Sequence, residues 1–208
     1  MKIRTVTEKE SSWAEIKKAA LAGTLGECLK SKDIIPITLK DGRGLELEVG
    51  RDEIGKTYFI FHDIPERHCM NRDWTNSGGW EASEARRYAN GEFFDLLPDD
   101  LREVIEETTV VQIWDGRRHE TKDKLFCLSE TQVFGKDGWY NGEQDPEDTQ
   151  IDIFKDRRGR IKNYNGSASN WWLRSAYNAY SFSCVYSNGG ENSNSAYYSY
   201  GLVLGFTI

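Results

Sequence analysis

The last eight residues, 201–208, constrain the fold most, because they form an almost wholly apolar run. Five of the eight are Leu, Val, Phe or Ile. An apolar run that does not alternate with polar residues predicts a strand covered on both faces. Such a strand holds the end of the chain in the core. The residues before it must then cross the surface between two anchored ends.

The first half of the chain carries helix and hairpin signals. Ser12 and Glu15 have the spacing of a capping box, and apolar residues then recur at helical spacing as far as Gly23. Residues 34–39 and 45–49 flank a glycine-containing turn and predict a β-hairpin. We therefore expect an amphipathic helix followed by antiparallel strands.

Residues 82–105 have a helical pattern with a break near Asn90, and residues 110–114 and 125–128 predict strands. Strands and helices do not alternate regularly, as a parallel sheet would require. We predict a single domain over residues 1–208 of the α+β class. Its helices lie mainly in the first half, its strands are short and antiparallel, and a buried strand ends the chain.

Charge and hydropathy exclude several classes of partner. The net charge of -7 and the pI near 5.1 give no basic face for a phosphate backbone, so we expect no nucleic acid. No 18 consecutive residues are apolar, which predicts no membrane insertion. The N-terminus lacks the apolar region of a signal peptide, so we expect synthesis in the cytoplasm. A later position on a virion or a cell surface stays open.

Residues 173–208 have the composition of a binding surface. Six Tyr, seven Ser and four Asn make up 17 of these 36 residues. Antibody paratopes concentrate the same types, because Tyr offers a large contact area at a small cost in rotamer entropy, while Ser and Asn supply adaptable hydrogen-bonding groups. The alternative is a polar β-region whose tyrosines only pack against the core.

A second count concerns Lys, Glu, Gln, Met and Trp, which no codon ending in a pyrimidine encodes. These five types account for 44 of residues 1–172, whereas residues 173–208 contain only Glu191. Solvated segments normally accept Lys and Glu readily, so ordinary surface exposure does not explain the depletion. Randomisation of the adenines in AAC or AAT codons would leave this pattern.

We therefore expect residues 171–208 to form a variable ligand-binding region displayed on a rigid scaffold. Its expected contact residues are Tyr177, Asn178, Tyr180, Ser181, Ser183, Tyr186, Asn188, Asn192, Asn194, Tyr197, Tyr198 and Tyr200.

Three strings carry a resemblance to a known family: WWLRS at 171–175, GGWEAS at 78–83 and DKLFCLS at 123–129. Together they resemble a domain family of unknown function found in gut bacteria and their phages, over most of the chain from about Trp13. That family resembles the C-type lectin fold, and some members are similar to the variable proteins of diversity-generating retroelements. The resemblance implies a lectin-like scaffold that displays variable residues to bind changing ligands. Aromatic and small polar residues without a calcium motif suit broad contact, so we expect a protein or cell-surface ligand, with a glycan as the other option.

Other chemistry finds less support in the sequence. The Glu-Pro-Asn, Gln-Pro-Asp and Trp-Asn-Asp triplets of calcium-dependent lectins are absent, although Asp145, Glu147, Asp148 and Asp152 could supply oxygen ligands. Residues 62–69 hold two His and one Cys at no standard zinc spacing. We expect no metal and no cofactor.

Two rival functions remain from other classes. Formylglycine-generating oxidases share the lectin-like fold but resemble one another in a pair of C-terminal cysteines, whereas Cys184 stands alone here. We therefore expect no catalytic residues and no enzyme. A phage or cell-surface structural protein with a fixed interface is the other alternative.

Overall fold

The computed structural model describes residues 12–136 and 147–208, which form an α+β fold of helices and mainly antiparallel sheets. Asp145 lies outside the described residues. The helices are α1 (Trp13–Leu21), α2 (Leu25–Cys28), α3 (Gly79–Ala82), α4 (Glu84–Tyr88), α5 (Phe94–Leu96), α6 (Asp99–Val104) and α7 (Glu130–Phe134), with a π-helical turn η1 (Ala89–Phe93) and the 3-10 turns η2 (Asp152–Phe154) and η3 (Arg157–Arg160).

Two five-stranded sheets organise the described residues. The first sheet has the order β1-β2-β3-β14-β7 and consists of β1 (Ile34–Thr38), β2 (Gly44–Arg51), β3 (Thr57–Phe61), β7 (Phe126–Cys127) and β14 (Leu204–Phe206). The second sheet has the order β12-β11-β10-β13-β4 and consists of β4 (Glu66–His68), β10 (Trp171–Ala176), β11 (Ser181–Val185), β12 (Glu191–Ser195) and β13 (Tyr200–Leu202). The described residues also form two separate hairpins. One pairs β5 (Thr108–Trp114) with β6 (Arg117–Asp123), and the other pairs β8 (Lys162–Tyr164) with β9 (Ser167–Ser169).

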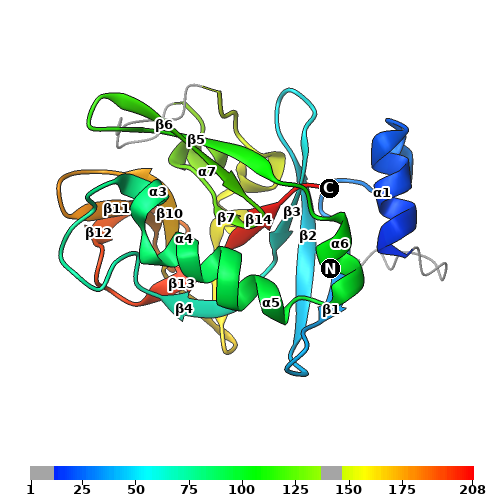
Figure 1. Ribbon diagram of the computed structural model, residues 1–208, viewed down its shortest axis with the longest axis horizontal. Coiled ribbons are helices and arrows are strands. Elements are labelled where there is room, and N and C mark those ends of the chain that lie inside the picture. The colour runs from blue at the N-terminus through cyan, green and yellow to red at the C-terminus, as the bar shows by residue number, and fades with distance from the viewer. Residues whose placement is uncertain (1–11, 137–146) are drawn as a thin grey trace.

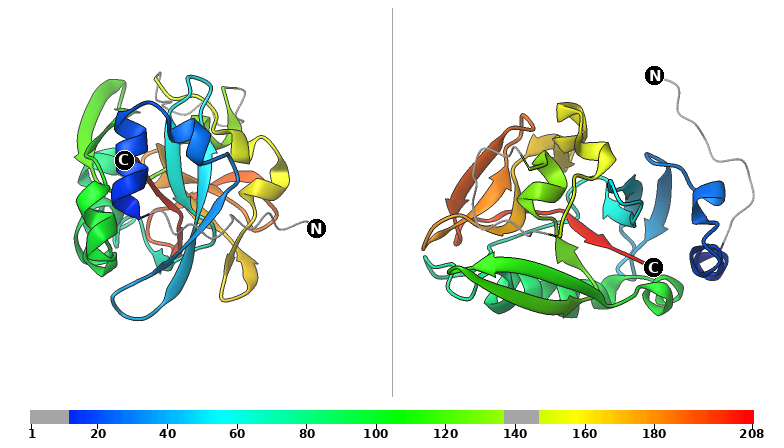
Figure 2. Two further views of the ribbon diagram at one scale, coloured as in Figure 1. Left: turned by 90° about the vertical axis from the view of Figure 1, so that its right-hand side faces the viewer. Right: turned by 90° about the horizontal axis from the view of Figure 1, so that it is seen from above.

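The second sheet lies at the end of the molecule opposite α1, with the first sheet between them (Figures 1 and 2). Strand β14 runs through the middle of the fold, where Phe206 stacks on Phe59 with ring centroids 5.4 Å apart. A cluster of buried apolar side chains extends from Trp13 to Phe206. The strands that carry the Tyr-rich segment are thus backed by the core.

The local helix and hairpin predictions are confirmed. Ser12 and Glu15 form both bonds of the capping box of α1, and Gly23 follows the helix with a φ of 70°. Strands β1 and β2 pair antiparallel as expected. The break expected near Asn90 is instead a widened turn, η1, which continues the helical path. Each correct prediction rests on contacts between residues close in sequence.

The prediction of one buried strand at the chain end is wrong in one respect. Residues 200–206 are buried or half-buried, but they divide into β13 and β14, which belong to different sheets. Gly201 permits the close approach at this crossing, because a Cβ atom there would lie 2.6 Å from the Ile64 side chain. The chain end therefore fastens both sheets to each other.

Arg174 in β10 connects the second sheet to the rest of the core. Its side chain is only 3% exposed, and the guanidinium donates to the carbonyl of Cys127 at 3.1 Å and to Oε1 of Gln132 at 2.8 Å. It also forms an ion pair with Asp148 at 2.5 Å. The Arg174 carbonyl accepts from Nε2 of Gln112 at 2.9 Å. One residue thereby links β10 to β7, α7, β5 and the segment before η2.

Replacing Arg174 by Met should lower the free energy of unfolding by about 3–5 kcal/mol, because the Asp148 carboxylate would stay buried without its counter-charge. Chemical denaturation measures this loss. The control is Lys40→Met, which removes an exposed ion pair with Asp99 and should cost at most about 1 kcal/mol. Equal denaturation midpoints for the two variants would contradict the role assigned to Arg174.

Candidate functional site

Exposed tyrosines gather where the strands of the second sheet end. Tyr177, Tyr180, Tyr197 and Tyr198 are 40–48% exposed. The β10–β11 turn that carries the first two lies beside the end of β12, since the main-chain N–H of Ala196 donates to the Tyr180 carbonyl at 2.9 Å. Clusters of exposed aromatic rings are unusual on a soluble protein unless they contact a partner.

Three of these side chains form a stacked row, here called the tyrosine row: Tyr197, Tyr198 and Tyr200. Ring centroids are 4.7 Å apart between Tyr197 and Tyr198, and 5.9 Å apart between Tyr198 and Tyr200. Tyr200 is half-buried and lies 4.8 Å from the fully buried ring of Trp172. The row therefore begins in the core and ends in solvent.

The phenols of Tyr197 and Tyr200 have pKa values above the usual range. Burial raises the pKa of Tyr200, and the hydrogen bond and charge of Tyr198 raise the pKa of Tyr197. A hydroxyl that remains protonated can both donate and accept. The row thus offers neutral aromatic area with polar tips.

The expectation of surface side chains is wrong for Ser181 and Ser183. Both lie in β11, a strand covered on both faces, and Ser183 has no exposed surface. The Ser183 hydroxyl donates to Oε2 of Glu130 at 2.7 Å. A strand between two neighbours, with packing above and below, buries even its small polar residues. Neither side chain can contact a ligand on the exposed face.

Tyr186 and Asn188 lie in the β11–β12 turn, at the other end of these strands. The Asn188 carbonyl accepts from Nε of Arg157 at 2.8 Å. Gly189 has a φ of 74°, and a Cβ atom there would lie 2.5 Å from the carbonyl oxygen of Arg157. Tyr186 is half-buried against the core. The structure therefore separates these two residues from the turn that carries Tyr177 and Tyr180.

The four asparagines of the segment share one local role. Each side-chain carbonyl accepts a main-chain N–H within two residues of itself, at 2.7–3.0 Å: Asn178 from Tyr180, Asn188 from Gly190, Asn192 from Ser193, and Asn194 from Ser195. Asn194 also donates to the hydroxyl of Tyr200 at 2.6 Å. Such bonds shape turns and edges. One of the two lone pairs of each of these carbonyl oxygens is thus already bound to the backbone.

One exposed aromatic residue escaped the sequence analysis. Trp74 is 62% exposed and lies outside the Tyr-rich segment, in the loop between β4 and α3. Its ring centroid is 4.7 Å from that of Tyr180, and its indole N–H donates to Oγ of Ser195 at 3.1 Å. The sequence signal that could have indicated this exposed side chain was a Trp within a run of small and polar residues.

Asn76 holds the Trp74 loop against the β10–β11 turn. It is 3% exposed, its side chain donates to the carbonyls of Asn178 and Ser181, and its main-chain N–H donates to the carbonyl of Ala179. The carbonyl of Ala196 accepts from the main-chain N–H of Met70 at 2.8 Å. Loop and turn therefore form one connected surface.

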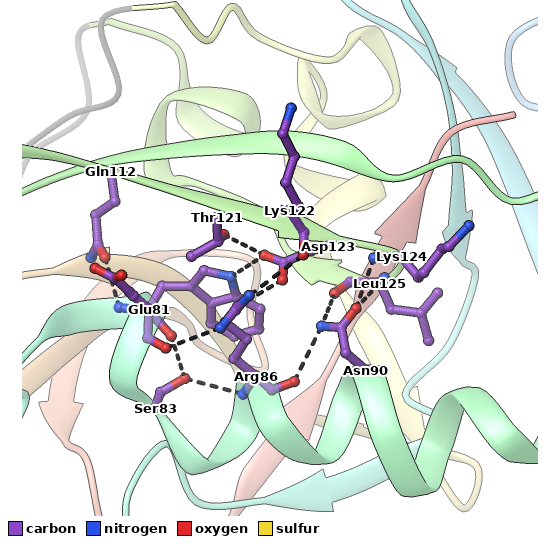
Figure 3. Close-up of polar contacts among 11 residues, drawn as sticks. Glu81, Ser83, Arg86, Asn90, Gln112, Thr121, Lys122, Asp123, Lys124 and Leu125 are labelled. Atoms are coloured by element: carbon purple, nitrogen blue, oxygen red, sulfur yellow. Dashed lines mark hydrogen bonds and ion pairs between the residues drawn. The ribbon is translucent and has the colours of Figure 1, made fainter.

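The residues that follow this loop are fixed by a buried polar network around Asp123 (Figure 3). Asp123 is fully buried and accepts from the Trp80 indole at 2.9 Å and from Nε of Arg86 at 2.6 Å. The main-chain N–H of Trp80 donates to Oε1 of Gln112 at 2.6 Å. Gln112 also binds the Arg174 carbonyl, so the network joins the Trp74 loop to β10.

No three His, Cys, Asp or Glu side chains come together as a metal-binding group within residues 12–136 and 147–208. Asp148 is paired with Arg174, and Asp152 accepts the main-chain N–H of Arg51 at 2.9 Å. His62, which opens the His/Cys run, contacts Glu48 at 3.1 Å. Burial raises the pKa of the Cys184 thiol, which disfavours a nucleophilic thiolate.

The helices of the described ranges are all too short or too polar to cross a membrane.

The fold and surface define an α+β protein in which a buried scaffold carries exposed aromatic side chains. Residues 54–208 match the model of a domain family of unknown function, DUF6273, and the chain belongs to this family. No curated protein and no solved structure matches the chain.

Ser183→Tyr and Tyr198→Ser should differ sharply in stability. The first overfills a closed site and removes a hydrogen bond to Glu130, at a cost of about 3 kcal/mol or more. The second changes an exposed ring and should cost about 1 kcal/mol or less. Thermal melting compares them. If both lowered the melting temperature equally, the assignment of Tyr198 to the surface would fail.

Asn76→Ala should loosen the β10–β11 turn, because the carbonyls of Asn178 and Ser181 lose their donor. We expect a loss of about 1–3 kcal/mol and faster hydrogen exchange at residues 177–180. Asn188→Ala, at the far end of the strands, is the matched control and should leave this exchange unchanged. Unchanged exchange in Asn76→Ala would show that the turn does not depend on this clamp.

Proposed function

We propose that this protein recognises a ligand through the exposed aromatic surface of its C-terminal segment. The observation that carries the proposal is the set of four exposed tyrosines in the β10–β11 turn and the turn after β12, beside two strands, β10 and β11, that are buried throughout. Large side chains with few rotatable bonds lose little entropy on binding, which suits them to contact surfaces. The proposed ligand is a protein or another cell-surface molecule, and a glycan is the alternative.

We further propose that the scaffold is C-type-lectin-like and that retroelement-directed diversification changes the surface. The separation of exposed from buried positions supports this. Trp171, Trp172 and Leu173, whose usual codons contain no adenine, are fully buried. Four of the exposed positions are Tyr, which single adenine changes produce from Asn codons, and two more, Asn178 and Asn188, are Asn itself. Exchange at exposed sites away from caps and cores costs about 0.5 kcal/mol or less.

The alternative interpretation of the same surface is a fixed interface, whose sequence stays constant because its partner does. A structural component of a phage particle or cell surface could use these tyrosines to contact one constant partner. Such a protein would keep the same tail in related strains, whereas a diversified one would change residues 171–208 and leave the preceding residues alone. An enzyme is not proposed, since the thiol of Cys184 is buried with no exposed surface.

The neighbouring DNA tests diversification. We expect a reverse-transcriptase gene and a near-copy of the sequence that encodes residues 171–208, with differences confined to adenines of the copy. The copy should read AAC or AAT at Tyr177, Tyr180, Tyr197 and Tyr198. Glu191 requires a codon that ends in a purine, so it should be constant or differ in its template codon.

Sequencing of the locus in related strains provides the measurement. Variation spread evenly over all 208 residues, or a locus without a template copy, would overturn diversification. A constant tail would instead support the fixed interface.

A further inference from the structure

We infer that this surface binds a segment of a partner protein through aromatic ring faces, with Trp74 as a fixed anchor beside the variable segment. The inference rests on the proposed function, and it adds the chemistry of the ligand and one contact residue outside residues 171–208. Three observations carry it: the occupied asparagine carbonyls, the placement of Trp74, and the rigidity of its loop.

The occupied carbonyls disfavour a sugar. A sugar ring needs several donors and acceptors around the aromatic platform, because each of its hydroxyls must be satisfied when it is desolvated. Asn178, Asn192 and Asn194 direct their carbonyls to their own backbone, and Ser195 accepts the indole N–H of Trp74. The surface offers the faces of aromatic rings, with the tyrosine hydroxyls as polar groups at their tips.

The same bonds disfavour binding by addition of a strand. Strand β12 is the edge of the second sheet, where an extended peptide could pair with the main chain. Asn192 and Asn194 occupy the main-chain N–H groups of Ser193 and Ser195 on this strand. A partner segment therefore binds across the side chains rather than along the edge.

Trp74 and the tyrosine row flank the strand edge. Asn194 contacts Tyr200 and Ser195 contacts Trp74, and consecutive strand residues project to opposite sides. Trp and Tyr dominate the energetic centres of protein interfaces, where they fill pockets formed by apolar or cationic side chains. Glu191 is the one charged residue of segment 176–200, and Arg72 and Asp73 are exposed charged residues beside Trp74.

Rigidity makes Trp74 an anchor rather than a mobile side chain. Asn71 donates to the Thr75 carbonyl at 2.7 Å and accepts the main-chain N–H of Glu84 at 3.1 Å, closing the loop on both sides of Trp74. Asn76 fastens the loop to the β10–β11 turn. An aromatic residue held in place before binding loses little further entropy when the partner docks.

Selection from a random-peptide library displayed on phage, with the full chain as bait, tests the inference. Enriched peptides are synthesised and titrated against the wild type, Trp74→Ala, Trp74→Phe and Ile54→Ala. Ile54 is the matched control, because it is similarly exposed but lies in the β2–β3 turn. We expect Trp74→Ala to weaken binding by roughly tenfold or more and Ile54→Ala by less than about twofold. Trp74→Phe keeps a ring face and should retain most of the affinity.

A glycan array, probed without calcium, provides the second arm, with Tyr180→Ser and Tyr198→Ser as surface variants. Peptides that bind Trp74→Ala as tightly as the wild type would overturn the anchor. Glycan hits that the tyrosine variants lose, with no enriched peptide, would overturn the protein partner but keep the proposed function. If neither probe gives binding that these variants weaken, the proposed function itself fails. Thermal melting of each variant shows that losses of binding do not come from unfolding.

Discussion

The buried guanidinium of Arg174 is the contact on which the proposed recognition surface depends. It lies in the strand that precedes the Tyr-rich turns and binds β7, α7 and Asp148. A planar group with several donors suits this role, since one side chain can satisfy separate acceptors at once. Through Gln112 the same site reaches Trp80 and the loop that carries Trp74. Hydrogen bonds therefore connect the buried scaffold to the exposed loop that carries Trp74.

Neighbouring residues of the C-terminal segment have different structural roles. Phe182, Ser183 and Cys184 are fully buried in β11, whereas the β10–β11 turn exposes Tyr180 and the turn after β12 exposes Tyr197. The asparagines fix the turns and the strand edge through short local bonds. Side chains can then be exchanged at exposed positions without disturbing the backbone that displays them. This division suits a surface that changes, and equally one that binds a constant partner.

Local signals predicted part of the fold, and long-range contacts decided the rest. The capping box of α1 and the hairpin of β1 and β2 depend on neighbouring residues, so sequence reasoning found them. The division of residues 200–206 between two sheets depends on strands far away in the chain. Ser183 resembles the surface serines in composition, and only Glu130, which is 53 positions away, marks it as buried. Trp74 is placed at the candidate site by its contacts with Tyr180 and Ser195, which are far away in the sequence.

The central claim is that a rigid scaffold and an exchangeable surface coexist in one short segment. Two libraries test it most directly, one randomising Tyr177, Tyr180, Tyr197 and Tyr198 together, the other randomising residues 182–184 with Trp172. The measurement is the fraction of clones that stay folded, as judged by resistance to proteolysis. The account predicts that most clones of the first library and very few of the second stay folded. Similar fractions in both libraries would contradict it.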